Sequence, residues 1–363
     1  MYYLEYFVFK KKLQFNLVML LALILFSVGL GLVGGLVWFQ KESTPRKPYE
    51  LRLSGAYQYI NPLLECELGG LIEHKSLAPF KRLVKDKVDV YLKSNQASEI
   101  SVYYRELNDG QWFGIDEDKD FIGASLMKVP IMLAFFKQSQ SDPDLLSTPV
   151  DVSSLNEQIN QYHQELENFW GIYDQKPYYP PEQAVEIDQT YTIGELIDRM
   201  IIESDNQARL VLSLLIDPEA VVSLELDLGI YANPADLAED YLTVKEYSAI
   251  FRYLYNASYL DRDYSEQALI LLSKSKFDRG LVAGVPVGVE VAHKFGEYGL
   301  EIDGVSTVQQ LHDCGIVYHP VAPYLLCVMT RGQQTDNLAN VIASISRLVY
   351  NQVEKRYANI QIY

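Results

Sequence analysis

The spacing of apolar residues changes along the chain. Stretches in which apolar and polar residues alternate predict strands, and stretches with apolar residues at helical spacing predict helices. Residues 99–107 alternate and are rich in β-forming side chains, and residues 111–115 repeat the pattern after the hairpin signal Asn108-Asp109-Gly110. Strand-like runs reappear only late in the chain, at 289–294, 315–318 and 324–331. The pattern therefore predicts two groups of strands separated by a long middle segment.

Helical periodicity fills most of the remaining chain. Residues 77–95 carry an apolar stripe, the middle segment is mostly helical, and the C-terminal segment has apolar residues at Leu338, Val341, Ile342, Ile345, Leu348 and Val349. We expect an α+β fold in which an antiparallel sheet, assembled from both chain ends, is flanked by helices. An all-α subdomain would be inserted at roughly 125–275.

The first 39 residues differ from the rest of the chain. Residues 17–39 are almost uninterruptedly apolar, long enough to cross a bilayer core of about 30 Å at about 1.5 Å per residue. The lysines at 10–12 favour a cytoplasmic N-terminus. A cleavable signal peptide is the alternative, although the run is long for one and no small-residue cleavage site ends it. We expect a single-pass protein of the cell membrane with a short cytoplasmic segment (1–16), a transmembrane signal-anchor helix (17–39), a tether and leading helix (40–98) and an extracytoplasmic domain (99–363).

Charge and cysteine content limit the partners. The net charge is −17, so the body repels nucleic acid and anionic lipid head groups, and we expect no nucleic-acid partner. The three cysteines, Cys66, Cys314 and Cys327, lack metal-ligand spacing, and we expect no metal and no cofactor. Cys314 and Cys327 are equidistant from a hairpin turn near 319–322, which would allow a disulfide. Two separately buried thiols are the expected state.

Ser125-Leu126-Met127-Lys128 contains a candidate nucleophile and base. An apolar helix follows, so Ser125 is expected at a helix N-terminus, with Lys128 one turn later on the same face. An ammonium cannot accept a proton, so the site must lower the pKa of Lys128 by burial and by a neighbouring cation, for which Lys294 is the natural candidate. Taken alone, an N-capping serine beside a solvated lysine is the more ordinary interpretation. A second Ser-x-x-Lys occurs at 273–276.

Ser204-Asp205-Asn206 supplies a second set of candidate groups. It follows the capping-box pattern at 192–195 and is expected to end or interrupt a helix. Ser204 would pass a proton to a leaving nitrogen, Asn206 would hold a substrate amide, and Asp205 would bond nearby backbone groups. A polar loop without chemistry is the alternative.

His293-Lys294-Phe295-Gly296 lies at the end of a β-rich run. Gly296 would let a substrate backbone approach the strand, and the N–H of Glu297 would join that of Ser125 in an oxyanion hole. A basic residue on a solvated edge strand is the ordinary alternative.

These three motifs, in this order, resemble those of the class A β-lactamases and penicillin-binding serine hydrolases. The resemblance covers roughly residues 99–363 and includes the stretches 124–130 and 279–286. It implies an α/β subdomain beside an all-α one, with the site in the cleft between them. It also implies roles for five residues: Ser125 as nucleophile, Lys128 as base, Ser204 as proton relay, Asn206 as substrate contact and Lys294 as the charge facing a substrate carboxylate.

Two departures limit what the resemblance implies. Phe295 stands where the third motif usually has a hydroxyl residue, and Glu297 follows it, so a penicillin carboxylate would be held less tightly. The stretch 227–241 lacks the Glu-x-x-Leu-Asn pattern of the glutamate that activates water for deacylation. An acyl-enzyme would then form and persist. The insertion at 139–190 would form either a lid over the cleft or a surface loop.

We therefore expect a membrane-tethered serine acyl hydrolase that forms an acyl-enzyme on Ser125 with β-lactams or D-Ala-D-Ala-like cell-wall amides, with slow deacylation. A penicillin-binding D-alanyl peptidase is one alternative. A non-turnover ligand-binding ectodomain is another, although residues 1–16 are too few for a signalling module. The sequence leaves the oligomeric state open.

Overall fold

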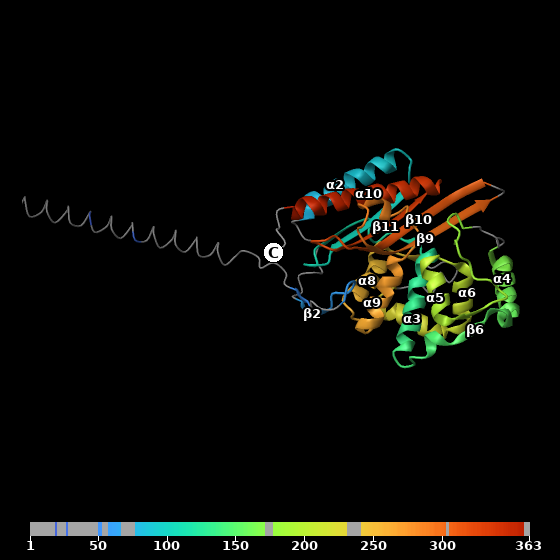
Figure 1. Cartoon of the computed structure of the whole chain (residues 1–363). Coiled ribbons are helices and arrows are strands. Elements are labelled where there is room, and N and C mark those ends of the chain that lie inside the picture. The colour runs from blue at the N-terminus through green and yellow to red at the C-terminus, as the bar shows by residue number, and fades with distance from the viewer. Residues whose placement is uncertain are drawn as a thin grey trace, which may run out of the picture. The chain divides into compact units, whose positions relative to one another are not determined.

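The computed structural model describes Met19, Ser27 and residues 50–52, 57–66, 77–170, 177–230, 241–302 and 305–358. The chain divides into two units, residues 1–47 and 48–363, and the architecture below is that of the second (Figure 1). Apart from Met19 and Ser27, the predicted membrane segment at 17–39 lies outside the described residues. Within the part of the chain that is described, no helix has the length and apolar character needed to cross a membrane.

An antiparallel five-stranded sheet with the strand order β4-β3-β11-β10-β9 forms the centre of this unit. Its strands are β3 (Glu99–Glu106), β4 (Trp112–Ile115), β9 (Val291–Ile302), β10 (Val305–Val317) and β11 (Tyr324–Gly332). Pairing of β3 with β11 joins the early hairpin to the three late strands, as the sequence predicts. β9 and β10 extend well beyond the predicted runs, because polar side chains interrupt the apolar pattern while the backbone ladder continues.

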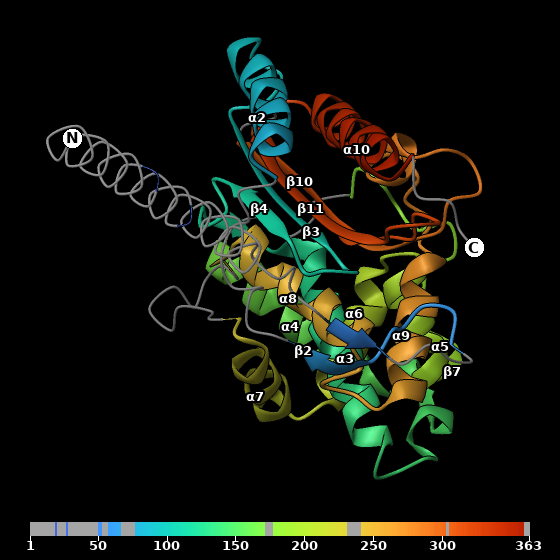
Figure 2. The same ribbon diagram turned by 90° about the vertical axis from the view of Figure 1, so that its left-hand side faces the viewer.

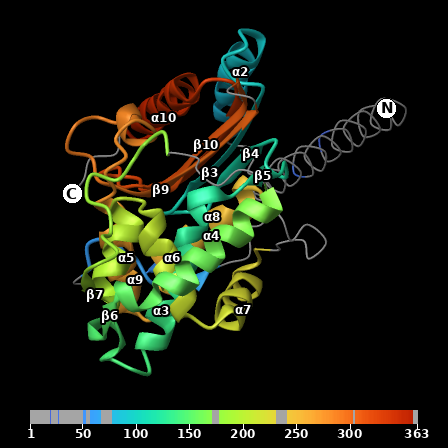
Figure 3. The same cartoon turned by 90° about the vertical axis from the view of Figure 1, so that its right-hand side faces the viewer.

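Helices cover both faces of the sheet (Figures 2 and 3). α2 (Ala78–Lys93) and α10 (Thr335–Tyr357) pack on one face, and α8 (Val244–Tyr255) and α9 (Arg262–Ser273) pack on the other. The same helical group contains α3 (Lys128–Ser139), α4 (Asn156–Trp170), α5 (Ile193–Ile202), α6 (Asn206–Leu215) and α7 (Pro218–Leu228). The α+β architecture predicted from the sequence is thereby confirmed.

Short elements connect and brace these helices. The 3-10 turns are η3 (Ala124–Met127), η4 (Leu145–Ser147), η5 (Val152–Leu155) and η7 (Val282–Gly284). Three two-stranded pairs are formed by β1 (Glu50–Arg52) with β2 (Leu63–Cys66), β5 (Phe121–Ile122) with β8 (Tyr241–Leu242), and β6 (Pro149–Asp151) with β7 (Thr190–Thr192). The segment expected to be all-α therefore contains short strands as well as helices.

The sheet is buried on both faces, which gives two cores. On β11, Leu325 and Met329 belong to the core shared with the helical group, whereas Leu326 and Val328 belong to the core under α2 and α10. Successive side chains of a strand point to opposite faces, so a strand buried on both sides is apolar throughout. This explains the nearly continuous apolar run at 324–331.

Cys314 on β10 and Cys327 on β11 lie directly opposite each other and form a disulfide. The expectation of two separate thiols is therefore wrong. Both side chains belong to the core shared with the helical group, because the register of the two strands turns them to the same face. The sequence positions of the two cysteines do not fix the register of β10 and β11, because that register also depends on the geometry of the turn that joins the strands.

Candidate active site

Ser125 lies in η3, a single 3-10 turn that leads directly into α3. Ala124, immediately before it, has a φ of 48°, in the left-handed region that is uncommon for a residue with a Cβ. Within the described structure no side chain caps η3 or α3, so Ser125 is not a capping residue. Ser125 is partly exposed, whereas Lys128 is only 1% exposed. The interpretation as a capping serine beside a solvated lysine is therefore wrong.

Lys128 opens α3 and directs its amine toward the connection between α5 and α6. Its Nζ lies 2.5 Å from the backbone oxygen of Ser204, 3.2 Å from Ser204 Oγ and 2.7 Å from Asn206 Oδ1. Two of the predicted motifs, which are far apart in the sequence, thus meet at one amine.

The Ser204-Asp205-Asn206 triplet forms the connection between α5 and α6, as predicted. Ser204 adopts a positive φ of 56°, which turns the chain between the two helices. Asp205 caps α6, because its Oδ1 accepts the N–H groups of Gln207 (2.6 Å) and Ala208 (3.1 Å). Its Oδ2 accepts the N–H of Val185 at 2.6 Å. The structural role predicted for Asp205 is confirmed.

Lys294 reaches the same place from the sheet. Its Nζ donates to Ser204 Oγ at 2.7 Å and to the backbone oxygen of Phe295 at 3.0 Å, and the side chain is fully buried. The alternation of β9 turns Lys294 toward the helices and Phe295 toward the opposite core, where its ring stacks on Phe277 with centroids 4.2 Å apart. The interpretation of Lys294 as a solvated edge residue is wrong.

Burial is the main cause of the low pKa of both lysines. It lowers the pKa of Lys128 well below its usual value, and the positive charges of Lys294 and Arg209 lower that pKa further. Burial also lowers the pKa of Lys294 to about 7, against the opposing charges of Asp313 and Glu297. With one amine neutral, the Ser204 hydroxyl can accept a hydrogen bond from one lysine and donate its own proton to the other. The predicted cause of the low Lys128 pKa is confirmed.

Gly296 lies against the segment that carries Ser125. A Cβ at this position would stand 2.9 Å from the carbonyl oxygen of Gly123 and 3.2 Å from the backbone nitrogen of Leu126. The glycine therefore leaves room for the segment that carries Ser125, and its predicted role in letting a substrate backbone approach the strand stays a prediction. Glu297 follows directly on β9, and the pairing of its N–H with that of Ser125 in an oxyanion hole stays a prediction.

The end of the predicted insertion lies against β9 beside the lysine pair. The backbone N–H of Tyr179 points to the Glu297 carboxylate, 3.3 and 3.4 Å from its two oxygens. The Tyr179 ring packs edge-on against Phe277, with centroids 4.9 Å apart, and Tyr178 donates to Asp336 at 2.8 Å. Burial raises the pKa of Glu297, which the Tyr179 N–H and the two lysines oppose. Whether the insertion forms a lid or a surface loop stays a prediction, and its residues 171–176 lie outside the described residues.

The structure thus joins most of the predicted site residues directly. Lys128, Ser204, Asn206 and Lys294 form one hydrogen-bonded group. Sequence reasoning missed Arg209, whose charge helps to lower the pKa of Lys128. Its position one turn after Asn206 on α6 was the available signal. No group of His, Cys, Asp and Glu residues suited to a metal ion occurs in the described part of the chain.

The sequence profile of the beta-lactamase enzyme family matches residues 83–353. The chain belongs to this family. Membership of this family confirms the predicted enzyme class, a serine hydrolase acting on amide bonds. No curated protein sequence matches the chain.

Solved structures share the fold of this beta-lactamase family member. A mutant of PBP-A, solved as an acyl-enzyme complex with penicillin G, is 19% identical over 76% of this chain and 97% of that chain, with a TM-score of 0.60. A class A β-lactamase from Mycobacterium abscessus is 22% identical over 74% of this chain and 99% of that chain, with a TM-score of 0.56. A β-lactamase from Xanthomonas campestris pv. campestris is 17% identical over 75% of this chain and 97% of that chain, with a TM-score of 0.58. At these identities the likeness shows the fold.

Proposed function

We propose that the chain is a serine acyl hydrolase that forms an acyl-enzyme on Ser125 with a β-lactam or a D-Ala-D-Ala-like amide of the cell wall. The observation that carries the proposal is the Ser204 hydroxyl, which lies 3.2 Å from the Lys128 amine and 2.7 Å from the Lys294 amine. Burying two amines costs folding free energy. A purely structural domain would gain nothing from that cost, whereas proton transfer requires it.

In the acylation step, the neutral amine of Lys128 takes the proton of the Ser125 hydroxyl. Ser125 Oγ then forms a bond to the substrate carbonyl carbon. The N–H groups of Ser125 and Glu297 stabilise the negative charge that develops on the carbonyl oxygen. Ser204 gives its proton to the leaving nitrogen as the C–N bond breaks, and the Lys128 ammonium returns a proton to Ser204. Lys294 orients the Ser204 hydroxyl throughout.

The residues around the relay favour a substrate without a strongly bound carboxylate. Asn206 is exposed and its side-chain amide is available to a substrate carbonyl, while its Oδ1 faces Lys128. Phe295 offers no hydroxyl, and its buried ring lies with its centroid 4.2 Å from the Lys294 amine. Glu297 adds a carboxylate near the lysines. A penicillin would therefore acylate Ser125 but bind weakly beforehand.

We propose that deacylation is slow. The stretch 227–241 lacks the family's water-activating pattern, and its acidic residues Glu239 and Asp240 lie outside the described residues. Slow release of the acyl group is also the behaviour of a penicillin-binding D-alanyl peptidase, which is the second candidate function. The two candidates differ in whether a D-Ala-D-Ala peptide is cleaved.

We further propose that the enzyme is anchored in the cell membrane by residues 17–39, with its catalytic body outside the cytoplasm. The apolar run supports the anchor. The Cys314–Cys327 disulfide supports the compartment, because disulfides persist in oxidising surroundings.

The test is covalent labelling of the full-length protein, purified in detergent, with a fluorescent penicillin. We expect one acyl group per chain by intact mass, and we expect Ser125→Ala to abolish it. Ser273→Ala is the matched control, because it removes the serine of the second Ser-x-x-Lys, whose hydroxyl bonds Tyr59 and Ile270. Absence of the adduct on the wild-type protein would exclude the proposal.

The decay of the adduct separates the candidates. Persistence over hours supports slow deacylation, and rapid loss with release of hydrolysed penicillin indicates an efficient β-lactamase. Release of D-alanine from a D-Ala-D-Ala peptide would identify the peptidase. A persistent adduct without peptide cleavage would favour the non-turnover ligand-binding ectodomain.

A further inference from the structure

Two polar side chains of β10 hold the last residue of β5, just ahead of the nucleophile. Gln310 Oε1 accepts the backbone N–H of Ile122 at 3.2 Å, and His312 Nε2 lies 3.0 Å from the carbonyl oxygen of Ile122. Gln310 is 3% exposed and His312 is fully buried. The N–H and the C=O of a residue three positions before Ser125 are thus both bound by side chains of the central sheet.

The contacts of His312 fix its tautomer. The backbone N–H of Thr330 donates to Nδ1 at 3.2 Å, so Nδ1 is an acceptor and Nε2 carries the proton that is donated to Ile122. A second ring proton would point at the Thr330 N–H. Burial lowers the pKa of His312 to about 3, in agreement with a neutral ring. His312 therefore acts as a permanent link between β11 and β5.

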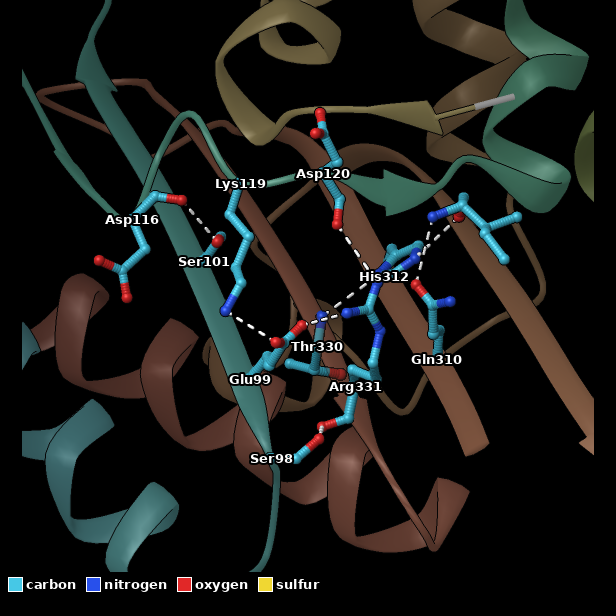
Figure 4. Close-up of polar contacts among 11 residues, drawn as sticks. Ser98, Glu99, Ser101, Asp116, Lys119, Asp120, Gln310, His312, Thr330 and Arg331 are labelled. Carbon is cyan, nitrogen blue, oxygen red and sulfur yellow. Dashed lines mark hydrogen bonds and ion pairs between the residues drawn. The ribbon is translucent and has the colours of Figure 1, made fainter. Parts of the chain in front are cut away.

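Figure 4 shows Gln310 and His312 two positions apart on one strand, within a wider set of contacts to the segment before Ser125. Arg331 donates to the backbone oxygen of Asp120 at 3.3 Å, and Ser101 donates to that of Asp116 at 2.6 Å. The sheet thus holds this segment at Asp116, Asp120 and Ile122. The bonds to Ile122 are the nearest of these contacts to Ser125.

The same part of β10 also supports the other side of the site. His312 is paired with Gly296 of β9, and Gly296 lies against Gly123 and Leu126. His312 therefore contacts the segment just before Ser125 and also pairs with β9, the strand that carries Lys294. Ala124, which lies between Gly123 and Leu126 in the sequence, has a left-handed φ. A residue with a Cβ keeps this conformation only where its surroundings hold the backbone in place.

We propose that His312 and Gln310 are positioning residues for the Ser125 nucleophile. By holding the N–H and C=O of Ile122, they fix the strained turn at Ala124 and with it the position of Ser125. This inference rests on the proposed acylation of Ser125. It goes beyond the three sequence motifs, because neither residue belongs to any of them.

The test compares His312→Leu with His319→Leu in the full-length protein. His319 is a matched control, because it is also buried, and its ring also bonds backbone N–H groups, those of Val321 and Ala322, but not the site. Penicillin acylation is followed over a range of concentrations, which separates the non-covalent dissociation constant from the acylation rate constant. Amide hydrogen exchange is measured for residues 122–126.

For His312→Leu we expect an unchanged dissociation constant, an acylation rate constant lowered at least about tenfold, and faster exchange at 122–126. His319→Leu should change neither reaction parameter. His312→Gln, which restores a donor near the Nε2 position, should recover part of the rate. Equal losses in the two leucine variants, or a wild-type rate in His312→Leu, would overturn the proposal.

Two further outcomes are separated by the design. If the wild-type protein is not acylated, the proposed function fails, and amide hydrogen exchange at residues 122–126 alone tests the positioning role. Faster exchange in His312→Leu but not in His319→Leu supports that role. Equal exchange in the two variants overturns it. If His312→Leu does not fold, Gln310→Met, which leaves the Ile122 N–H without its acceptor, is judged by the same rate and exchange criteria.

Discussion

The Lys294 amine, carried by β9, lies 2.7 Å from the hydroxyl oxygen of Ser204, which stands between α5 and α6. This hydrogen bond joins the central sheet to the helical group at the point where Lys128 also arrives. The proposed proton relay through Ser204 therefore depends on how the sheet and the helical group pack. Several consequences of this arrangement can be measured.

The acidity of Lys128 should set the acidic limb of the pH profile for acylation. Lys128 must be neutral to accept the Ser125 proton, so the acylation rate should rise as pH increases through its pKa. Arg209 lowers this pKa by its charge. Arg209→Gln should therefore raise the pKa and move the acidic limb to higher pH. Arg262→Gln, at the exposed start of α9, is the control. An unmoved limb in Arg209→Gln would contradict the electrostatic account.

Lys294→Met should stabilise the protein while impairing acylation. Burial lowers the folded pKa of Lys294 from 10.5 to about 7, so between these values the unfolded chain holds more protons and stability rises with pH. A difference of one between folded and unfolded pKa corresponds to about 1.4 kcal/mol of unfolding free energy. The variant should exceed the wild type most below pH 7 and progressively less toward pH 10.5. Urea unfolding at several pH values measures this difference. Lys245→Met, at an exposed ion pair with Asp118, should show no such trend.

Glu297→Gln should improve acylation by penicillins, which carry a carboxylate. The substitution removes a negative charge near the lysines but keeps an oxygen that can accept the Tyr179 N–H. Removal of one repulsive charge pair is worth about 1 kcal/mol, so the non-covalent dissociation constant should fall roughly fivefold. Glu182→Gln, at an exposed carboxylate paired with Lys276, is the control. A weaker interaction of Glu297→Gln with penicillin would show that Glu297 supports binding.

The Cys314–Cys327 disulfide should stabilise the sheet without being needed for catalysis. It closes a loop across the β10–β11 connection with a sequence separation of 13, for which the loop-closure estimate is about 3 kcal/mol. The double variant Cys314→Ala/Cys327→Ala should unfold at lower urea concentration and keep its acylation rate. Thiol alkylation of the unreduced, denatured protein checks the bond itself, since only Cys66 should react. Alkylation of all three cysteines would show that the bond does not form.

Much of the fold could be predicted because its hydrophobic periodicities are local. The apolar stripes of α2 and α10 and the strands β3, β4 and β11 agree with the predicted segments. β9 and β10 were only partly predicted, since Glu297 and His312 interrupt the apolar pattern while the strand continues. A residue's polarity reports its surroundings, whereas strand extent is set by backbone pairing with a neighbour.

For this protein, the sequence by itself determined the chemical groups of the site and their order: the serine and lysine of the first motif, the serine and asparagine of the second, and the lysine of the third. Only the tertiary structure decided that Lys294 is buried rather than solvated, that Gly296 accommodates η3, that the two cysteines are bonded, and that His312 holds Ile122. Each of these depends on strand register and on the packing of segments far apart in the chain. Register and packing are set by the whole set of contacts, so no local pattern of residues contains them.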